Sequence, residues 1–204
     1  MRIERLVIAT HNRKKGGEMR TILRRDLPDL EVLTLEDFPG CPEPEETGSN
    51  YRENAIIKAR SACDFTGEWS VADDAGLEVD ALDGAPGLYS KRFAGEDTPF
   101  PEKMRRILEE LRDVPEERRT ARFRAWVALA GPGGTLETVE GVREGRIAWE
   151  PAGEGGFGYD PIFFLPDLGR TMAQLTPDEK HATSHRGMAL GKLVEAIRRL
   201  NALE

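Results

Sequence analysis

Short apolar runs alternate with segments of helical periodicity in the first part of the chain. The run RLVIAT, residues 5–10, has the length and apolar content of a buried strand. Asn12 follows as a candidate N-cap, and apolar residues then recur along one helix face at Met19, Ile22, Leu23 and Leu27. The pattern predicts a strand, a loop and a helix.

The same rules predict the next elements. EVLTL, residues 31–35, is a second strand, and the acidic, Pro-rich EDFPGCPEPEETGS after it has the composition of a loop. Asn50 and Glu53 have the spacing of a capping box and open a helix that ends near residue 65. WSVADD and LEVDAL are predicted as two short strands broken at Ala75 and Gly76, before the glycine-rich loop GAPGLYSKRFAGED.

The second half continues with helix and strand signals. Thr98 and Pro99 start a helix with one apolar face, formed by Met104, Ile107, Leu108 and Leu111. ARFRAWVALAG alternates as a long strand, and TLETVEGVREGRIAW predicts one or two more beyond the turn GPGG, which suggests a hairpin. Thr176 and Glu179 cap a short helix, and a final helix carries Met188, Leu190, Leu193, Ile197 and Leu200.

Helices alternate with strands first and an antiparallel pair follows, so the predicted class is α/β with a mixed β-sheet and flanking helices. The chain has 204 residues and 39% apolar content, enough for one sizeable domain, which we expect to span residues 1–204. No apolar run reaches about 18 residues, so we expect no membrane span. Cys41 and Cys63 lie 22 residues apart without a CxxC pattern, which favours reduced thiols and a cytoplasmic location.

The net charge of −8 argues against a surface that binds nucleic acid polymers, because such surfaces normally carry a basic patch over a neutral or basic background. A small anionic ligand is compatible with this charge if basic residues gather locally or a metal mediates the contact.

Two adjacent carboxylates, Asp73 and Asp74, stand where the predicted strand WSVADD ends. Like charges this close oppose each other's ionisation unless a cation or a donor lies between them. Strand ends of α/β sheets are where ligands collect, and carboxylate oxygens suit Mg²⁺. The acidic set also includes Glu45, Glu46, Asp80 and Asp83, although most acidic side chains in a chain that is 32% charged are simply solvated.

Three further segments carry candidate chemistry. THNRKKGGE, from Thr10 to Glu18, places a cationic loop at a helix start, where backbone N–H groups and Lys14 or Lys15 suit a phosphate; a solvated, capped helix start is the equal alternative. GEGGFGYDP contains G-x-G-x-x-G but lacks the preceding strand and following helix of a dinucleotide site. We interpret it as a flexible loop that presents Phe157 and Tyr159 for stacking on a base.

The third segment, KHATSHRG, gathers Lys180, His185 and Arg186 at a helix start, where cations oppose the helix dipole. Such a local conflict is expected where function overrides folding preference. His181 and His185 have i, i+4 spacing, but there is no HExxH glutamate or third ligand to support zinc. Without a G-x-S-x-G elbow, Ser184 and His185 do not indicate a hydrolase triad.

Five motifs occur in the order and spacing of one family: ATHNRKKGGE, EETGSNYRENAIIKAR, ADDAGLEVDALDGAPGLYSKRFAGED, GGFGYDPIFF and LTPDEKHATSHRGMAL. With them the chain closely resembles the inosine triphosphate pyrophosphatase family over nearly all of its length. The resemblance implies two lobes around a central nucleotide-binding cleft, a homodimer and dependence on Mg²⁺. It also implies hydrolysis of the non-canonical purine triphosphates ITP, dITP and XTP to the monophosphate and pyrophosphate.

Matched motif by motif, the resemblance makes Asp74 the proton acceptor and a metal ligand, and Glu45 the other metal ligand. It assigns the triphosphate to a loop formed by Thr10, His11, Asn12, Arg13, Lys14 and Lys15. It assigns the base to Phe157, Gly158, Tyr159 and Asp160, and further substrate contacts to Lys58, Ala75, Lys180, His185 and Arg186. Lys15, Lys58 and Lys180 are the candidate clamps for the leaving pyrophosphate.

The chain departs from the common family pattern at Ala75, where serine is usual, and at His11, where glycine is usual. Two alternatives stay open: a pyrophosphatase for modified or pyrimidine triphosphates like the Maf family, and a nucleotide-binding regulator that has lost catalysis. The match at SHRG and GFGYDP favours the purine family over the first, and Glu45, Asp74 and Lys15 speak against the second.

Overall fold

The computed structural model describes residues 2–134 and 136–202. In the first half, the strands and helices are β1 (Arg5–Ile8), α1 (Arg13–Asp26), β2 (Glu31–Thr34), α2 (Tyr51–Thr66), β3 (Trp69–Val79) and α3 (Phe100–Glu110). In the second half, they are β4 (Thr120–Ala130), β5 (Leu136–Ile147), β6 (Phe163–Leu165), β7 (Arg170–Thr171), α4 (Pro177–Thr183) and α5 (His185–Ala202). Thr135, at the start of the predicted TLETVEGVREGRIAW strand, lies outside the described residues.

The strands form a mixed sheet, as predicted. Within the described residues its order is β2-β1-β3-β4-β5-β6-β7. β1 pairs in parallel with both β2 and β3, whereas β6 is antiparallel to β5 and to β7. The α/β class is therefore confirmed.

One prediction about the sheet was wrong. WSVADD and LEVDAL are not two strands broken at Ala75 and Gly76, because β3 runs through both residues. Gly76 has no positive φ, and most β3 side chains are buried, so packing keeps the backbone extended where composition suggested a break. Asp73 and Asp74 consequently lie in the middle of β3. They come just after Val71, which pairs with Ile8 at the end of β1.

The chain folds as two compact units. The first contains the residues up to Asp74, Ala125–Gly141 and the residues from Arg186 onward, and the second contains Ala75–Arg124 and Val142–His185. The unit boundaries fall inside β3, β4 and β5. The single domain over residues 1–204 and the central cleft stay predictions.

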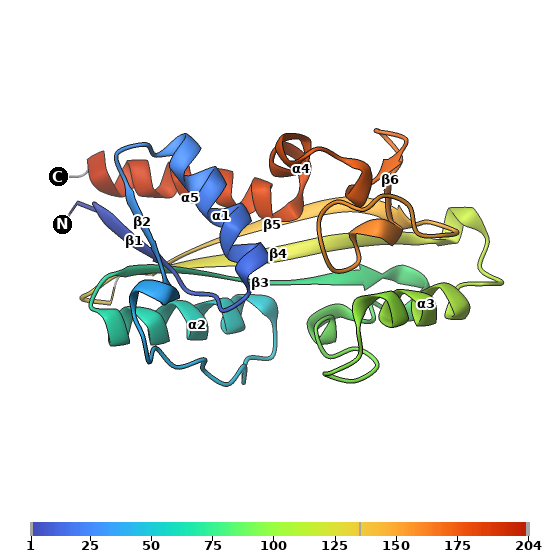
Figure 1. Cartoon of the computed structure of the whole chain (residues 1–204), viewed down its shortest axis with the longest axis horizontal. Coiled ribbons are helices and arrows are strands. Elements are labelled where there is room, and N and C mark those ends of the chain that lie inside the picture. Colours follow the sequence, from blue (N-terminus) through green and yellow to red (C-terminus); the bar gives the residue numbers. More distant parts are fainter. Residues whose placement is uncertain (1, 135, 203–204) are drawn as a thin grey trace. The chain divides into compact units, whose positions relative to one another are not determined.

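In the first unit, α1 and α5 cover one face of the strands and α2 covers the other (Figure 1). The α1 and α5 face is packed with large side chains, including Met19, Leu23, Leu190, Leu193 and Ile197. The α2 face is different, because small side chains predominate: Ala55, Ala59, Ala62 and Cys63 meet Ala72, Ala128 and Ala130. These small residues let the α2 backbone lie close to β3, so that polar side chains on the same helix can reach it.

The second unit has its own core. Leu77 and Val79 of β3 pack with Met104 and Ile107 of α3 and with a set of apolar residues that includes Tyr159, Ile162, Phe163, Met172 and Leu175. A buried arginine, Arg119, joins its elements by donating to the carbonyl oxygens of Leu111, Ile147 and Ala148.

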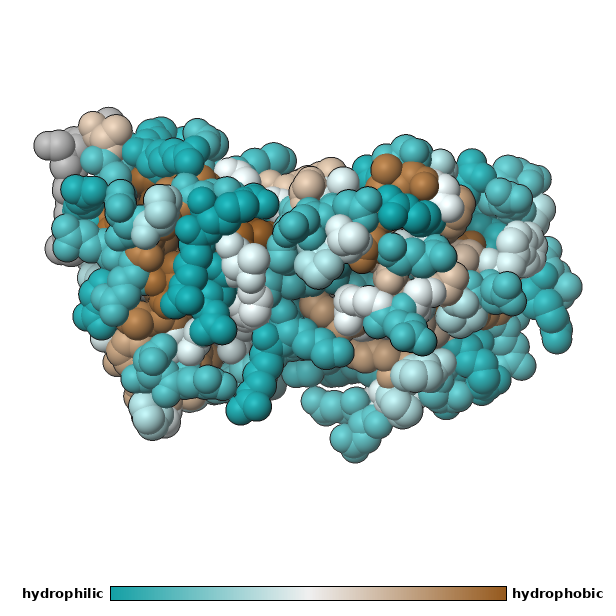
Figure 2. Space-filling model, turned by 45° about the horizontal axis from the view of Figure 1, so that its top comes forward, coloured by the Kyte–Doolittle hydropathy of each residue, from teal (hydrophilic) through white to brown (hydrophobic). Residues whose placement is uncertain are grey.

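Polar residues dominate the surface drawn in Figure 2, and apolar residues appear there only in separate small areas. Among the described residues, none of the helices combines the length and apolar content that crossing a membrane would require. Both cysteines are buried free thiols.

Candidate active site

The loop that follows β1 forms a capped helix start. The Asn12 side chain accepts hydrogen bonds from the backbone N–H groups of Lys14 and Lys15, both at 3.1 Å, and Thr10 Oγ1 accepts from Asn12 N at 3.2 Å. Two of the N–H groups considered for a phosphate are therefore already occupied by the cap. The side chains of His11, Arg13 and Lys14 are exposed beside it.

Lys15 differs from these neighbours because its side chain enters a buried network. Its Nζ lies 3.5 Å from Asp73 Oδ2. Burial lowers the pKa of Lys15, and the negative charge of Asp73 opposes that effect.

Asp73 is held by Arg186 from the other end of the chain. Arg186 Nε and Nη2 donate to Asp73 Oδ2 at 3.0 and 2.9 Å, and Arg186 Nη1 donates to Glu18 at 2.8 Å. The side chains of Arg186 and Asp73 are only 3% and 1% exposed. Burial by itself would raise the pKa of Asp73, but Lys15, Arg186 and Lys58 outweigh it and hold that pKa well below its usual range. Asp73 is therefore a fixed anion, and its Oδ1 has no hydrogen-bond partner among the described residues.

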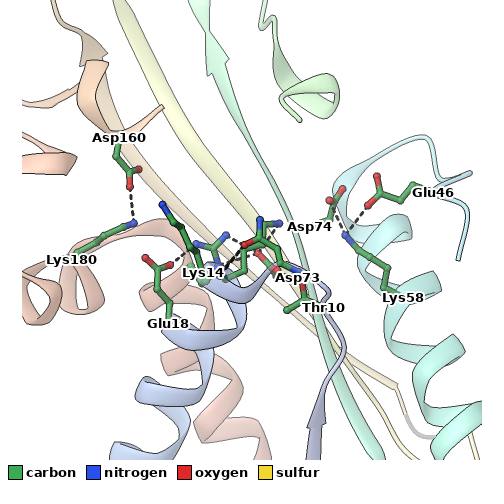
Figure 3. A network of polar contacts seen from close by, with 12 residues as sticks. Thr10, Lys14, Glu18, Glu46, Lys58, Asp73, Asp74, Asp160 and Lys180 are labelled. Carbon is green, nitrogen blue, oxygen red and sulfur yellow. Dashed lines mark hydrogen bonds and ion pairs between the residues drawn. The ribbon is translucent and has the colours of Figure 1, made fainter. Parts of the chain in front are cut away.

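Asp74 belongs to a separate set of contacts (Figure 3). Lys58 Nζ donates to Asp74 Oδ1 at 3.0 Å and to Glu46 Oε1 at 3.1 Å. Asn54 Nδ2 donates to Asp74 Oδ2 at 3.3 Å. Burial raises the pKa of Asp74, and the nearby ammonium groups of Lys58 and Lys15 reduce that rise without cancelling it. A buried carboxylate with a raised pKa suits the role of proton acceptor.

The like-charge problem of the adjacent pair is solved by the strand itself. Successive side chains of a strand point to opposite faces, so Asp73 meets Arg186 of α5 and Lys15 of α1, whereas Asp74 meets Lys58 and Asn54 of α2. Each carboxylate therefore has its own directly contacting cation, although the charges of Lys15 and Lys58 act on both. The sequence argument that cations or donors must offset these like charges is met here by side chains on the two faces.

A second polar cluster lies in the second unit, around the glycine-rich loop. Lys180 Nζ donates to Asp160 Oδ2 at 2.7 Å, with side chains that are 6% and 4% exposed. Phe157 N donates to the same oxygen at 2.8 Å, and Lys180 Nζ lies 4.5 Å from the centre of the Phe157 ring. Gly156 has φ +70°, and a Cβ there would overlap the Asp160 carboxylate. The loop is therefore folded around Asp160.

Two further rings of the second unit, those of Tyr159 and His185, are buried. Tyr159 was expected to be exposed for stacking, but it is buried, and its hydroxyl donates to the carbonyl oxygen of Ser90 at 2.8 Å. The apolar core of the second unit takes the ring, while Phe157 remains partly exposed. His185 is also buried, and its ring stacks on Phe123 with centroids 4.7 Å apart.

Comparison with known proteins identifies the family. The model of the Ham1 family matches residues 6–196. The chain belongs to the Ham1 family. A dITP/XTP pyrophosphatase from Desulforamulus reducens is 47% identical over 196 residues, which cover 96% of each chain. One from Geobacter sulfurreducens is 49% identical over 193 residues, covering 95% of this chain and 96% of that protein.

Solved Ham1 structures have the same fold. A HAM1 protein from Coxiella burnetii superposes with a TM-score of 0.86 at 43% identity, covering 96% of this chain and 98% of that one. The Ham1 protein of Staphylococcus aureus gives a TM-score of 0.84 at 37% identity, covering 95% and 98%. The family resemblance read from the five motifs is thereby confirmed.

This Ham1 protein offers two neighbouring carboxylates as side-chain ligands for Mg²⁺. Among residues 2–134 and 136–202, no three His, Cys, Asp or Glu side chains come together to hold a metal on their own. Mg²⁺ commonly takes only one or two carboxylates and completes its shell with waters and substrate phosphates. Asp74 and Glu46 supply two carboxylates around Lys58 Nζ, whereas the side chain of Glu45, the predicted ligand, is exposed.

The sequence reading of this Ham1 site missed two contributors. Glu46 was noticed in the acidic set but received no role, and Asn54 was not considered at all. A signal was present, since Asn54 and Lys58 have i, i+4 spacing and share one face of α2. That face could be connected to Asp74 only once the partner strand was known.

Proposed function

We propose that this Ham1 protein hydrolyses the non-canonical purine triphosphates dITP, ITP and XTP to the monophosphate and pyrophosphate. One observation carries the proposal: the buried Asp74 carboxylate, with its raised pKa, lies beside Lys58 in a chain 47% to 49% identical to proteins named dITP/XTP pyrophosphatase. The presence of a proton acceptor, Asp74, and a neighbouring cation, Lys58, favours an enzyme over an inactive nucleotide-binding regulator.

In the proposed reaction, a water oxygen attacks the α-phosphorus and the bond from that phosphorus to the bridging oxygen breaks. Asp74 accepts the proton of the water, and the electron pair of the broken bond leaves on pyrophosphate. Lys58 and Lys15 contribute positive charge near the reacting phosphates. Lys180 is likewise paired with a carboxylate, Asp160, and its role as a third clamp stays a prediction.

Mg²⁺ is part of the proposal, with Asp74 and either Glu46 or Glu45 as the side chains that would hold it. When bound, such an ion lowers the pKa of a coordinated water and offsets phosphate charge.

Base recognition is proposed for the loop that contains Phe157. A 6-keto oxygen accepts hydrogen bonds, so donors from loop N–H groups or His185 would hold hypoxanthine or xanthine. The 6-amino group of adenine would set donor against donor, and an unpaired buried polar group costs about 1 to 3 kcal/mol. Guanine also carries a 6-keto group, which makes GTP the informative competitor.

The test is pyrophosphate release from dITP, ITP, XTP, GTP, ATP and UTP in Mg²⁺. We expect kcat/KM for dITP and XTP to exceed that for ATP by about tenfold to a hundredfold, as one unpaired polar group predicts. Equal turnover of GTP would contradict the non-canonical preference, and preference for UTP would favour the Maf-like alternative. Binding without pyrophosphate release would indicate a regulator.

The homodimer and the cytoplasmic location accompany this proposal as predictions. Light scattering on the purified chain measures the first.

A further inference from the structure

Asn54 connects two parts of the candidate site through one side chain. It lies near the start of α2 and is 1% exposed. Its Oδ1 accepts a hydrogen bond from Gly48 N at 2.8 Å, and its Nδ2 donates to Asp74 Oδ2 at 3.3 Å. A backbone N–H can only donate, so the Gly48 contact fixes which end of the amide is oxygen and leaves the NH₂ group for Asp74.

Gly48 belongs to the acidic loop, residues 45–49, and it packs tightly against Asn54. A Cβ at Gly48 would come within 2.6 Å of Asn54 Oδ1 and 2.7 Å of Glu53 Cβ. The same loop is tied to α2 on both sides of this contact. Glu46 accepts from Lys58, and Ser49 N and Oγ donate to Glu53 Oε2 at 2.7 and 2.9 Å.

The two carboxylate oxygens of Asp74 are each held by one donor from α2. Lys58 bonds Oδ1 and Asn54 bonds Oδ2, so both contacts would have to break before the carboxylate could rotate about its Cβ–Cγ bond. Asn54 is the neutral donor of the two, and it therefore orients the carboxylate without adding a second positive charge to neutralise it.

We propose that Asn54 is a positioning residue that holds the Asp74 carboxylate and the acidic loop in one fixed relation. The inference rests on the proposed function, because Asp74 is the proton acceptor there. Asn54 itself touches neither the water nor the phosphates in this scheme; it acts through Asp74 and through the loop that carries Glu45 and Glu46. Preorganisation of this kind lowers the barrier because the acceptor needs no reorientation when the substrate binds.

Two nearly isosteric variants separate the two bonds. Asn54→Asp keeps an oxygen acceptor for Gly48 N but removes the donor to Asp74, whereas Asn54→Leu removes both contacts without adding charge. For pyrophosphate release from dITP, we expect both variants to lower kcat by about 100-fold, a typical effect of misplacing a reacting group. KM should change by less than about threefold, because Asn54 makes no substrate contact.

Hydrogen exchange of the Gly48 amide supplies a readout that does not depend on turnover. We expect slow exchange in the wild type and in Asn54→Asp, and fast exchange in Asn54→Leu. Gly48→Ala tests the same contact from the loop side, since its Cβ would push the loop away from Asn54. It should lower kcat in the same way, and it serves as the second variant if one of the Asn54 substitutions fails to fold.

Asn50→Ala is the matched control. Asn50 stands at the same helix start, where its side chain accepts from Glu53 N at 3.0 Å and caps α2. Loss of the cap should lower the melting temperature while kcat stays within about twofold of wild type. A general loosening of α2 would instead lower kcat in this control as well, and that result would overturn the positioning role.

The outcomes distinguish the two proposals. If the wild type releases pyrophosphate while both Asn54 variants keep kcat within about threefold of it, the inference about Asn54 fails and the proposed function stands. If the wild type releases no pyrophosphate from any purine triphosphate, the proposed function fails and the positioning role fails with it.

Discussion

At the residue scale, Asp73 and Asp74 have opposite electrostatic surroundings although they are adjacent in β3. Lys15 and Arg186 hold the pKa of Asp73 far below its usual range despite the opposing effect of burial, so this side chain stays ionised. Burial raises the pKa of Asp74, and its cations compensate only in part. The difference supports the proposal that Asp74 is the proton acceptor, while Asp73 contacts Lys15 and Arg186.

Asp74→Asn should therefore lower kcat for dITP by about 100-fold or more, the usual contribution of a general base. Initial rates of pyrophosphate release at saturating dITP and Mg²⁺ measure it. Asp64→Asn is the control, because Asp64 is an exposed aspartate of α2. A rate for Asp74→Asn within about tenfold of wild type, roughly 1.4 kcal/mol, would contradict the assigned role.

At the element scale, the starts of α1, α2 and α4 have side-chain caps that are visible in the sequence. Asn12 caps α1, Asn50 caps α2, and Thr176 forms a full capping box with Glu179 at the start of α4. The box predicted at α2 is only half formed, because Glu53 turns to Ser49 and does not reach the backbone N–H of Asn50. This hydrogen bond joins residues only four apart in sequence, yet it ties the acidic loop to α2.

Glu179 gives the α4 cap a defined pH dependence. Its side-chain hydrogen bonds from Arg170, followed by the backbone N–H of Thr176, lower the pKa of Glu179 to about 2. A lowered folded-state pKa means that the contribution to stability is complete above the unfolded value, near pH 4.3, and is lost as the pH falls toward about 2. Carbon NMR titration of the Glu179 carboxyl should show this value, and Arg170→Met should raise it. A midpoint near 4.3 in the wild type would contradict the hydrogen-bonded cap.

At the scale of the whole molecule, the first unit is assembled from chain segments that are far apart in sequence. Ile3 N donates to Asn201 Oδ1 at 2.7 Å, across 198 residues, and Arg186 reaches Asp73 across 113 residues. The cationic start of α5, unfavourable for the helix dipole, is thereby explained at Arg186 by its acidic partners on other elements. Its predicted role in nucleotide contact stays a prediction.

Arg186→Met would leave Asp73 buried with Lys15 as its remaining close cation. Breaking a buried ion pair on one side typically costs about 3 to 5 kcal/mol, and we expect a loss of this size in the free energy of unfolding, measured by urea denaturation at pH 7. Arg199→Met removes the exposed pair with Glu137 and should change stability by less than about 1 kcal/mol. If the two substitutions lowered the free energy of unfolding equally, the buried Asp73 pair would contribute no more to stability than an exposed pair.

The sequence by itself determined the α/β class, most helix starts and the family. Apolar periodicity, caps and motifs are local signals, and they can be recognised without knowing which elements pack together. It also singled out Asp74, Lys15 and Lys58. Only the tertiary structure decided that β3 continues through Ala75 and Gly76, that Asp73 and Asp74 face different helices, and that Tyr159 is buried. It alone also joined Asn54 and Glu46 to the site. Each of these four findings depends on which helices and strands pack against β3 or against the glycine-rich loop. Those elements are distant from each other in the sequence and come together only when their apolar surfaces are buried.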